Sequence, residues 1–184
     1  MWLICGLGNP NNNHKLTRHN LGFDIIDALV SFNKCKLIKK DNNKELYKGK
    51  IGIKECLLCK PLTYMNLSGP PIGKLINFYK ISSSKIIIIH DDLDLKVGKV
   101  KIKTGGGNGG HNGLLSIDHT IGKNYKRVRI GIGRPVLKEM ISSYVLEKFS
   151  TEDRELIENK TSLLSINFSL IFEDEALLLT KITS

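Results

Sequence analysis

Polar side chains follow several apolar runs of the sequence, at positions where buried strands would end. Asn9 and Asn66 each come shortly after such a run, and Asp91 follows a stretch of isoleucines. The carboxyl ends of parallel strands share one rim of an open α/β sheet, and ligands bind at that rim. If these strands are parallel, the sequence predicts that the three side chains emerge together.

A glycine-rich loop at 105–113 carries His111 and Asn112 and can close the same site from the side. An Asn amide offers a donor and an acceptor without charge, which suits binding an ester or peptide and stabilising an oxyanion. A histidine takes a proton from water when a carboxylate holds its other ring nitrogen. The chain has no Gly-x-Ser-x-Gly elbow, so this set favours water as the nucleophile.

The glycines of the sequence do not form a nucleotide-binding loop. Gly6 and Gly8 begin a dinucleotide-binding pattern, but Asn11 stands where its third glycine is needed. The loop at 105–113 lacks the Lys-Ser/Thr pair of a phosphate-binding loop. No nucleotide cofactor is therefore expected. Pro10 instead biases Asn9 toward an extended backbone, which fixes where its amide points.

The apolar pattern predicts one α/β domain over residues 1–184, with a mixed, mostly parallel central sheet flanked by helices. The continuous β-branched run at 85–92 is the clearest strand and is typical of one buried on both faces. Further strands are predicted at 2–5, 35–40, 45–60, 98–103 and 127–133. Helices are predicted at 21–32, 68–81 and 112–121. A capping box of Ser150 with Asp153 predicts the start of one long C-terminal helix.

The charge of the chain favours an anionic partner. Lys and Arg number 28 against 18 Asp and Glu, a net charge of +10, and nucleic acid is the commonest partner of such a surface. Compositional drift toward lysine is the alternative. No stretch approaches the ~18 apolar residues of a membrane span, and the apolar start is too short for a secretion signal. A cytoplasmic protein with reduced cysteines is expected, in which the Cys56 and Cys59 pair belongs to a buried strand rather than a zinc or redox site.

Six motifs occur in order along the chain: GLGNP, TRHNLGF, KPLTYMNLSG, HDDLDL, GGGNGGHNGL and RVRIGIGRP. Through these motifs the chain up to about Phe149 resembles the bacterial peptidyl-tRNA hydrolases. The resemblance implies hydrolysis of the ester between the C-terminal carbonyl of a peptide and the 3'-terminal ribose of tRNA. It also implies a monomer that contacts the acceptor stem and 3' end of peptidyl-tRNA and uses no metal or organic cofactor.

The resemblance also implies roles for single residues. His19 is the implied general base, Asp91 its orienting carboxylate, and Asn9 a group that binds substrate near the ester. Further contacts to the peptide, the ester or the tRNA are implied for His14, Tyr64, Met65, Asn66, Lys103, Asn112 and Arg129. Of these, Lys103 and Arg129 match positions that touch tRNA phosphates, although both lie on alternating strands where a merely solvated side chain is common.

The chain departs from the family pattern at three places. His14 stands where the family usually has Tyr, which stacks better on a base. Asn108 replaces a His or Ser of the glycine loop, and the C-terminal helix lacks the usual tail signature.

Two other functions use the same residues. The acidic cluster HDDLD with His90 and His111 offers metal ligands, although not at a recognised spacing. An RNA-binding accessory protein that has lost hydrolysis would keep the basic surface, but its His, Asp and Asn set would be eroded, and here that set is intact.

Overall fold

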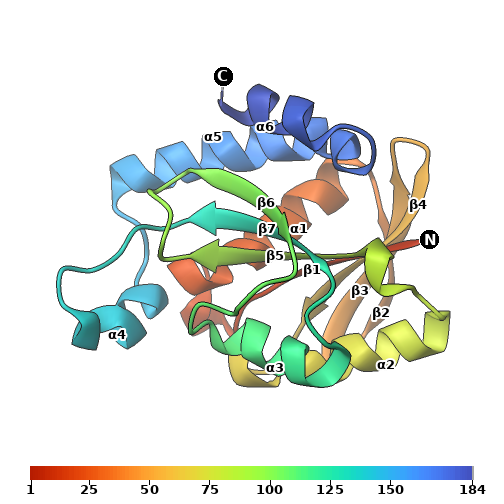
Figure 1. Cartoon of the computed structure of the whole chain (residues 1–184), viewed down its shortest axis with the longest axis horizontal. Helices are drawn as coiled ribbons and strands as arrows, with labels where there is room; N and C mark the ends of the chain where they lie inside the picture. The colour runs from red at the N-terminus through yellow and green to blue at the C-terminus, as the bar shows by residue number, and fades with distance from the viewer. Residues whose placement is uncertain (184) are drawn as a thin grey trace.

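The computed structural model describes residues 1–183, in which a sheet of seven strands lies between two layers of helices (Figure 1). The strand order is β2-β3-β4-β1-β5-β7-β6. The strands are β1 (Trp2–Gly6), β2 (Lys36–Lys40), β3 (Lys44–Ile51), β4 (Lys54–Pro61), β5 (Ile86–Asp92), β6 (Val100–Thr104) and β7 (Lys126–Gly131). The central strands β4, β1, β5 and β7 run parallel, and the outer pairs are antiparallel. The predicted α/β class with a mixed sheet is confirmed.

Each face of the sheet is covered by its own helices, because successive side chains of a strand point to opposite faces. Ile87 and Ile89 of β5 pack with α1 (Leu21–Phe32), α5 (Thr151–Asn167) and α6 (Glu175–Thr183). Ile86 and Ile88 pack with α2 (Gly69–Tyr79) and α3 (Asn112–Ile121). The short helix α4 (Ile141–Leu146) lies beyond the carboxyl ends of the parallel strands (Figure 1).

The single strand predicted at 45–60 is wrong, because this segment contains the hairpin of β3 and β4. Ile51 pairs with Lys54 across a turn at Gly52, which has a φ of +56°. A left-handed φ is cheap only for glycine. The apolar alternation of the two strands continues through this turn, which is why the sequence pattern hides it.

The C-terminal segment is two helices rather than the one long helix predicted. Ser150 does begin α5, since its side chain accepts a hydrogen bond from the Asp153 backbone N–H at 3.1 Å. A 3-10 turn at Phe168–Phe172 then breaks the helix and packs the ring of Phe172 4.8 Å from that of Trp2. Asp174 accepts from the backbone N–H of Leu177 at 2.9 Å and begins α6. Over residues 1–183, no helix is long and apolar enough to cross a membrane.

Candidate active site

A cavity of about 1040 Å³ opens at the carboxyl ends of β1, β4 and β5. These strands are parallel, so the prediction that Asn9, Asn66 and Asp91 share one rim is confirmed. The predicted site residues on its wall are Asn9, His19, Tyr64, Met65, Asn66, Asp91, Lys103, Asn112 and Arg129. His14 is not among the wall residues; it is half-buried in the 3-10 turn Asn12–His14, where its carbonyl accepts from the Thr17 hydroxyl at 2.8 Å.

A close approach of two glycines brings His19 to this rim. A side chain on Gly6, at the end of β1, would overlap the carbonyl oxygen of Gly22 in the first turn of α1. Because neither residue has a side chain, α1 begins directly against the end of the sheet. The 3-10 turn Arg18–Asn20, which precedes α1, therefore holds His19 beside the end of β5.

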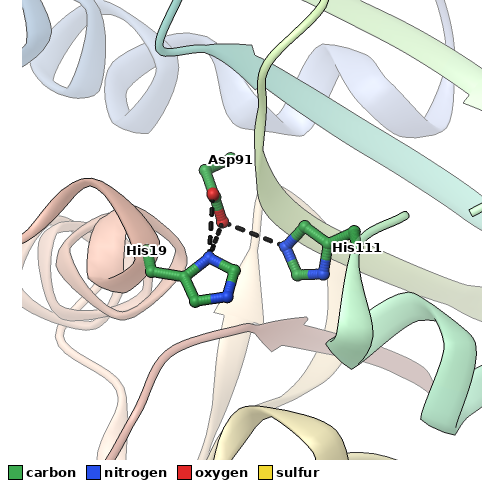
Figure 2. A group of neighbouring side chains, drawn as sticks. All are labelled: His19, Asp91 and His111. Carbon is green, nitrogen blue, oxygen red and sulfur yellow. Dashed lines mark hydrogen bonds and ion pairs between the residues drawn. The ribbon is translucent and has the colours of Figure 1, made fainter. Parts of the chain in front are cut away.

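His19 and Asp91 form a buried pair (Figure 2). The Nδ1 of His19 lies 3.0 and 2.9 Å from the two carboxylate oxygens of Asp91. Because a carboxylate only accepts hydrogen bonds, Nδ1 carries the hydrogen and the lone pair is on Nε2. Nε2 lies on the far side of the ring from Asp91 and has no hydrogen-bond partner among residues 1–183 (Figure 2). His19 lies on the wall of the cavity and therefore presents its basic Nε2 to it.

The electrostatics of this pair favour a basic imidazole. Burial lowers the pKa of His19, but the charge of Asp91 and the hydrogen bond to it outweigh burial, so the pKa is raised above 6.5. Burial raises the pKa of the Asp91 carboxyl, but His19 and His111 stabilise its charged form more strongly and hold the pKa well below its usual range. Asp91 is therefore ionised at neutral pH and stabilises the imidazolium that forms when His19 takes a proton.

His111 is a second partner of Asp91, which the sequence did not reveal. Its Nε2 donates to Oδ1 of Asp91 at 3.0 Å (Figure 2). Its Nδ1 accepts from the backbone N–H groups of Gly113 and Leu114, at 3.1 and 3.4 Å, in the first turn of α3. The two sets of hydrogen bonds fix one neutral tautomer, with the hydrogen on Nε2. One side chain thus caps α3 and holds the carboxylate.

His90 lies buried beside Asp91, with 2% of its surface exposed. Its Nδ1 donates to the backbone carbonyl of Asp91 at 2.7 Å, and its Nε2 has no partner among residues 1–183. Burial and the neighbouring His111 lower the pKa of His90 to about 3. It is neutral at physiological pH and adds no positive charge that would compete with His19 for Asp91.

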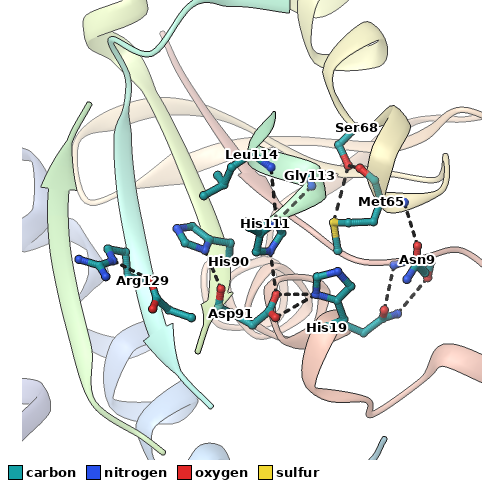
Figure 3. A network of polar contacts seen from close by, with 12 residues as sticks. Asn9, His19, Met65, Ser68, His90, Asp91, His111, Gly113, Leu114 and Arg129 are labelled. Atoms are coloured by element: carbon teal, nitrogen blue, oxygen red, sulfur yellow. Dashed lines mark hydrogen bonds and ion pairs between the residues drawn. The ribbon is translucent and has the colours of Figure 1, made fainter. Parts of the chain in front are cut away.

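The amide of Asn9 has a fixed orientation (Figure 3). Its Oδ1 accepts from the Met65 backbone N–H at 2.8 Å. The backbone of Asn9 is held by Asn20, whose amide accepts from Asn9 N at 2.8 Å and donates to Asn9 O at 2.9 Å. Because Oδ1 is occupied, the two N–H donors of Nδ2 remain for a ligand in the cavity. Asn20 was not predicted, and its place directly after His19 in the TRHN motif was the only signal for it.

The other predicted residues form the sides of the cavity. Tyr64, with 54% of its surface exposed, lies on one side with Asn66, both in the loop that follows β4. Lys103 and Arg129 lie on the other side, from β6 and β7. Arg129 is not free, because its Nε donates to Asp92 at 2.7 Å (Figure 3).

The potential metal ligands of the site are His19, Asp91 and His111, whose ligand atoms all lie within 4.8 Å of one another. In the hydrogen bonds described above, both ring nitrogens that face Asp91 carry hydrogen. A metal ion bound through these two nitrogens would have to displace both protons. This group differs from the metal ligands suggested by the sequence, which included His90. The Nδ1 of His90 is directed at a backbone carbonyl.

The sequence of nearly the whole chain fits one known family. The family model for peptidyl-tRNA hydrolase matches residues 3–182. The chain belongs to the peptidyl-tRNA hydrolase family. Relatives in this family include the peptidyl-tRNA hydrolases of Rickettsia canadensis, 43% identical, and Rickettsia conorii, 44% identical, each over 176 residues. Both alignments cover 95% of this chain and 95% of the relative.

Solved structures of peptidyl-tRNA hydrolases have the same fold. The crystal structure of the enzyme from Acinetobacter baumannii superposes with a TM-score of 0.92 at 36% identity, covering 100% of this chain and 95% of that one. Its Arg119Gln mutant gives a TM-score of 0.93 over the same shares of the two chains. The structural match includes the C-terminal segment, which lies beyond Phe149 and contains none of the sequence motifs.

Proposed function

We propose that this chain hydrolyses the ester between a peptide, or an N-blocked amino acid, and the 3'-terminal ribose of tRNA, and so recycles peptidyl-tRNAs released from ribosomes. The observation that carries this proposal is the His19 and Asp91 pair, with Nε2 of His19 unoccupied at a cavity that also holds the Asn9 amide. Membership of the peptidyl-tRNA hydrolase family supplies the substrate class.

In the proposed reaction His19 acts as general base. Its Nε2 takes a proton from water while the water oxygen forms a bond to the ester carbonyl carbon. The carbonyl electron pair moves to the oxygen, and Nδ2 of Asn9 donates to that oxyanion. When the carbonyl re-forms, the bond to the ribose oxygen breaks and the imidazolium returns its proton to that oxygen. The products are a tRNA with a free 3'-terminal hydroxyl and a peptide with a free carboxyl group, which releases the second proton of the water to solvent.

Asp91 and its neighbours hold His19 in the tautomer and orientation that a general base needs. The carboxylate stabilises the imidazolium and holds the tautomer with hydrogen on Nδ1. His111 limits the movement of the carboxylate, since it bonds Oδ1 while its own ring is tied to the start of α3. The reaction needs no metal ion at any step.

The remaining wall residues divide between the two parts of the substrate. Tyr64, Met65, Asn66 and Asn112 bind the peptide and the scissile carbonyl. Lys103 and Arg129 bind the phosphates of the tRNA acceptor end, and the net charge of +10 attracts the nucleic acid. For this role Arg129 must bind phosphate while Nε stays on Asp92, through the other edge of its guanidinium. His14 binds a nucleotide outside the cavity wall. The protein acts as a monomer in the cytoplasm.

The test is release of the amino acid from N-blocked aminoacyl-tRNA, with unblocked aminoacyl-tRNA as the control and each assay repeated with a chelator. The proposal predicts release from the blocked substrate only, with the same rate when chelator is present. Loss of activity with chelator would indicate a metallohydrolase. Salt-sensitive tRNA binding without release from either substrate would indicate an RNA-binding protein instead.

A further inference from the structure

Residues 105–110 of the glycine loop lead from the end of β6 toward the start of α3 (Figure 1). A side chain placed on Gly107, Gly109 or Gly110 would meet nothing within 4 Å. The start of the loop is tied to the sheet, where Gly105 N donates to the Tyr125 carbonyl at 3.1 Å. The middle of the loop therefore needs another group to hold it over the cavity.

Arg127 of β7 supplies that group. Its Nη1 donates to the carbonyl of Gly107 at 2.8 Å, and its Nη2 donates to the carbonyl of Gly106 at 3.2 Å. Among residues 1–183, no other side chain outside the loop forms a hydrogen bond to these two carbonyls. The planar guanidinium presents fixed donors, so it sets the position of both peptide groups at once.

Arg127 is itself held in place. Only 3% of its side chain is exposed, and Nη2 also donates to Oδ1 of Asp118 on α3 at 3.0 Å. The Tyr125 hydroxyl donates to the same carboxylate oxygen at 2.7 Å, and the guanidinium lies 4.6 Å from the centre of the Tyr125 ring. Arg127 therefore links the loop, α3 and β7 through one rigid group.

The position of the loop affects the side of the cavity that faces tRNA. Lys103 and Arg127 are directly paired on β6 and β7. The Lys103 amine lies against Gly106, so closely that a side chain on Gly106 would overlap it. If the carbonyls of Gly106 and Gly107 were released, the loop and the Lys103 amine would move together.

We propose that Arg127 is a positioning residue for substrate binding, which fixes the glycine loop and so holds the Lys103 amine where it contacts the substrate. The proposal rests on the hydrolase function above. Arg127 does this without touching the reacting atoms, because its donors end on the loop carbonyls and on Asp118, whereas Asp91 is bonded by His19 and His111. Loss of a contact that is equally strong in the bound substrate and in the transition state raises KM and leaves kcat unchanged, and we expect this for a Lys103 contact away from the reacting bond.

The test is Arg127→Lys, which keeps the positive charge beside Asp118 but cannot donate to both loop carbonyls. We expect KM for N-blocked aminoacyl-tRNA to rise roughly tenfold, with kcat changed by less than about threefold. The midpoint of the acidic limb of kcat against pH stays in place, because His19 and Asp91 are undisturbed. Hydrogen exchange of the backbone amides at 105–110 becomes faster while that of β5 does not.

Tyr125→Phe is the second variant, in case Arg127→Lys does not fold. It removes only the hydroxyl that holds Asp118, and a smaller rise in KM in the same direction is expected. The matched control is Tyr47→Phe, which removes a hydroxyl bonded to Glu45 at 3.0 Å on β3, away from the loop. Equal KM values in Tyr125→Phe and Tyr47→Phe, or a fall in kcat with unchanged KM in Arg127→Lys, would overturn the proposal. Inactive wild-type protein would instead refute the proposed hydrolase function.

Discussion

His111 donates from Nε2 to Oδ1 of Asp91 at 3.0 Å, and this hydrogen bond ties the start of α3 to the carboxylate that supports His19. His111→Asn tests its contribution. Asn is a good helix N-cap, so α3 is retained, but its shorter side chain does not reach Asp91. We expect kcat to fall roughly tenfold with little change in Tm, because the freed carboxylate no longer holds His19 in one orientation. His119→Asn, at an exposed position of the same helix, is the control; equal kcat values in the two variants would remove His111 from this role.

The pH profile tests the electrostatic role of Asp91. The carboxylate raises the pKa of His19 above 6.5 against the effect of burial. A general base works only when neutral, so the rate of the wild-type enzyme rises with pH through this raised pKa. In Asp91→Asn burial is left without the opposing charge, and the midpoint of the acidic limb moves to lower pH while the plateau rate falls. An acidic limb at the wild-type position would show that Asp91 does not set the basicity of His19.

The Asn9 amide allows an isosteric test. Asn9→Asp keeps an oxygen for the Met65 backbone N–H but removes the N–H donors that face the cavity. We expect kcat to fall by roughly 10²- to 10³-fold, as when an oxyanion donor is lost. Asn13→Asp adds the same charge at an exposed position of the same loop. If Asn13→Asp loses as much activity as Asn9→Asp, the loss comes from charge and the donor role is wrong.

The sequence predicted the rim of the site because strand ends are visible as changes from apolar to polar residues. Asn9 and Asp91 follow buried runs, and parallel pairing then brings them together without further information. The hydrogen bonds of Asn20, His111 and Arg127 were not predictable in this way. Each depends on the path of a loop or on the distance between elements, which residue types do not encode.

The two errors in the fold have the same physical origin. At Gly52 the apolar alternation continues through a tight turn, so only the backbone shows that the chain reverses. At Phe168 and Ile171 the apolar pattern continues through a 3-10 turn, because both side chains remain buried where the helix ends. In both places the apolar pattern runs on where the backbone turns, so the pattern alone does not fix the backbone.

Salt dependence tests the contact of Lys103 with tRNA. Binding should weaken with salt, and Lys103→Gln should reduce the log-log slope by about 0.7 to 0.9, the value for one neutralised phosphate. Lys50→Gln, an exposed lysine of β3 away from the cavity, should leave the slope unchanged. The same reduction in both variants would mean that Lys103 acts only through net charge.

The role of His19 as general base is tested by His19→Ala, assayed for both turnover of N-blocked aminoacyl-tRNA and binding of tRNA, with His119→Ala as the matched control. Loss of the general base should lower turnover on the order of 10²- to 10⁴-fold. Binding of tRNA should stay close to the wild-type value, because the basic residues on the cavity wall are unchanged. Turnover near the wild-type rate, or a loss of binding as large as the loss of turnover, would show that His19 is not the general base.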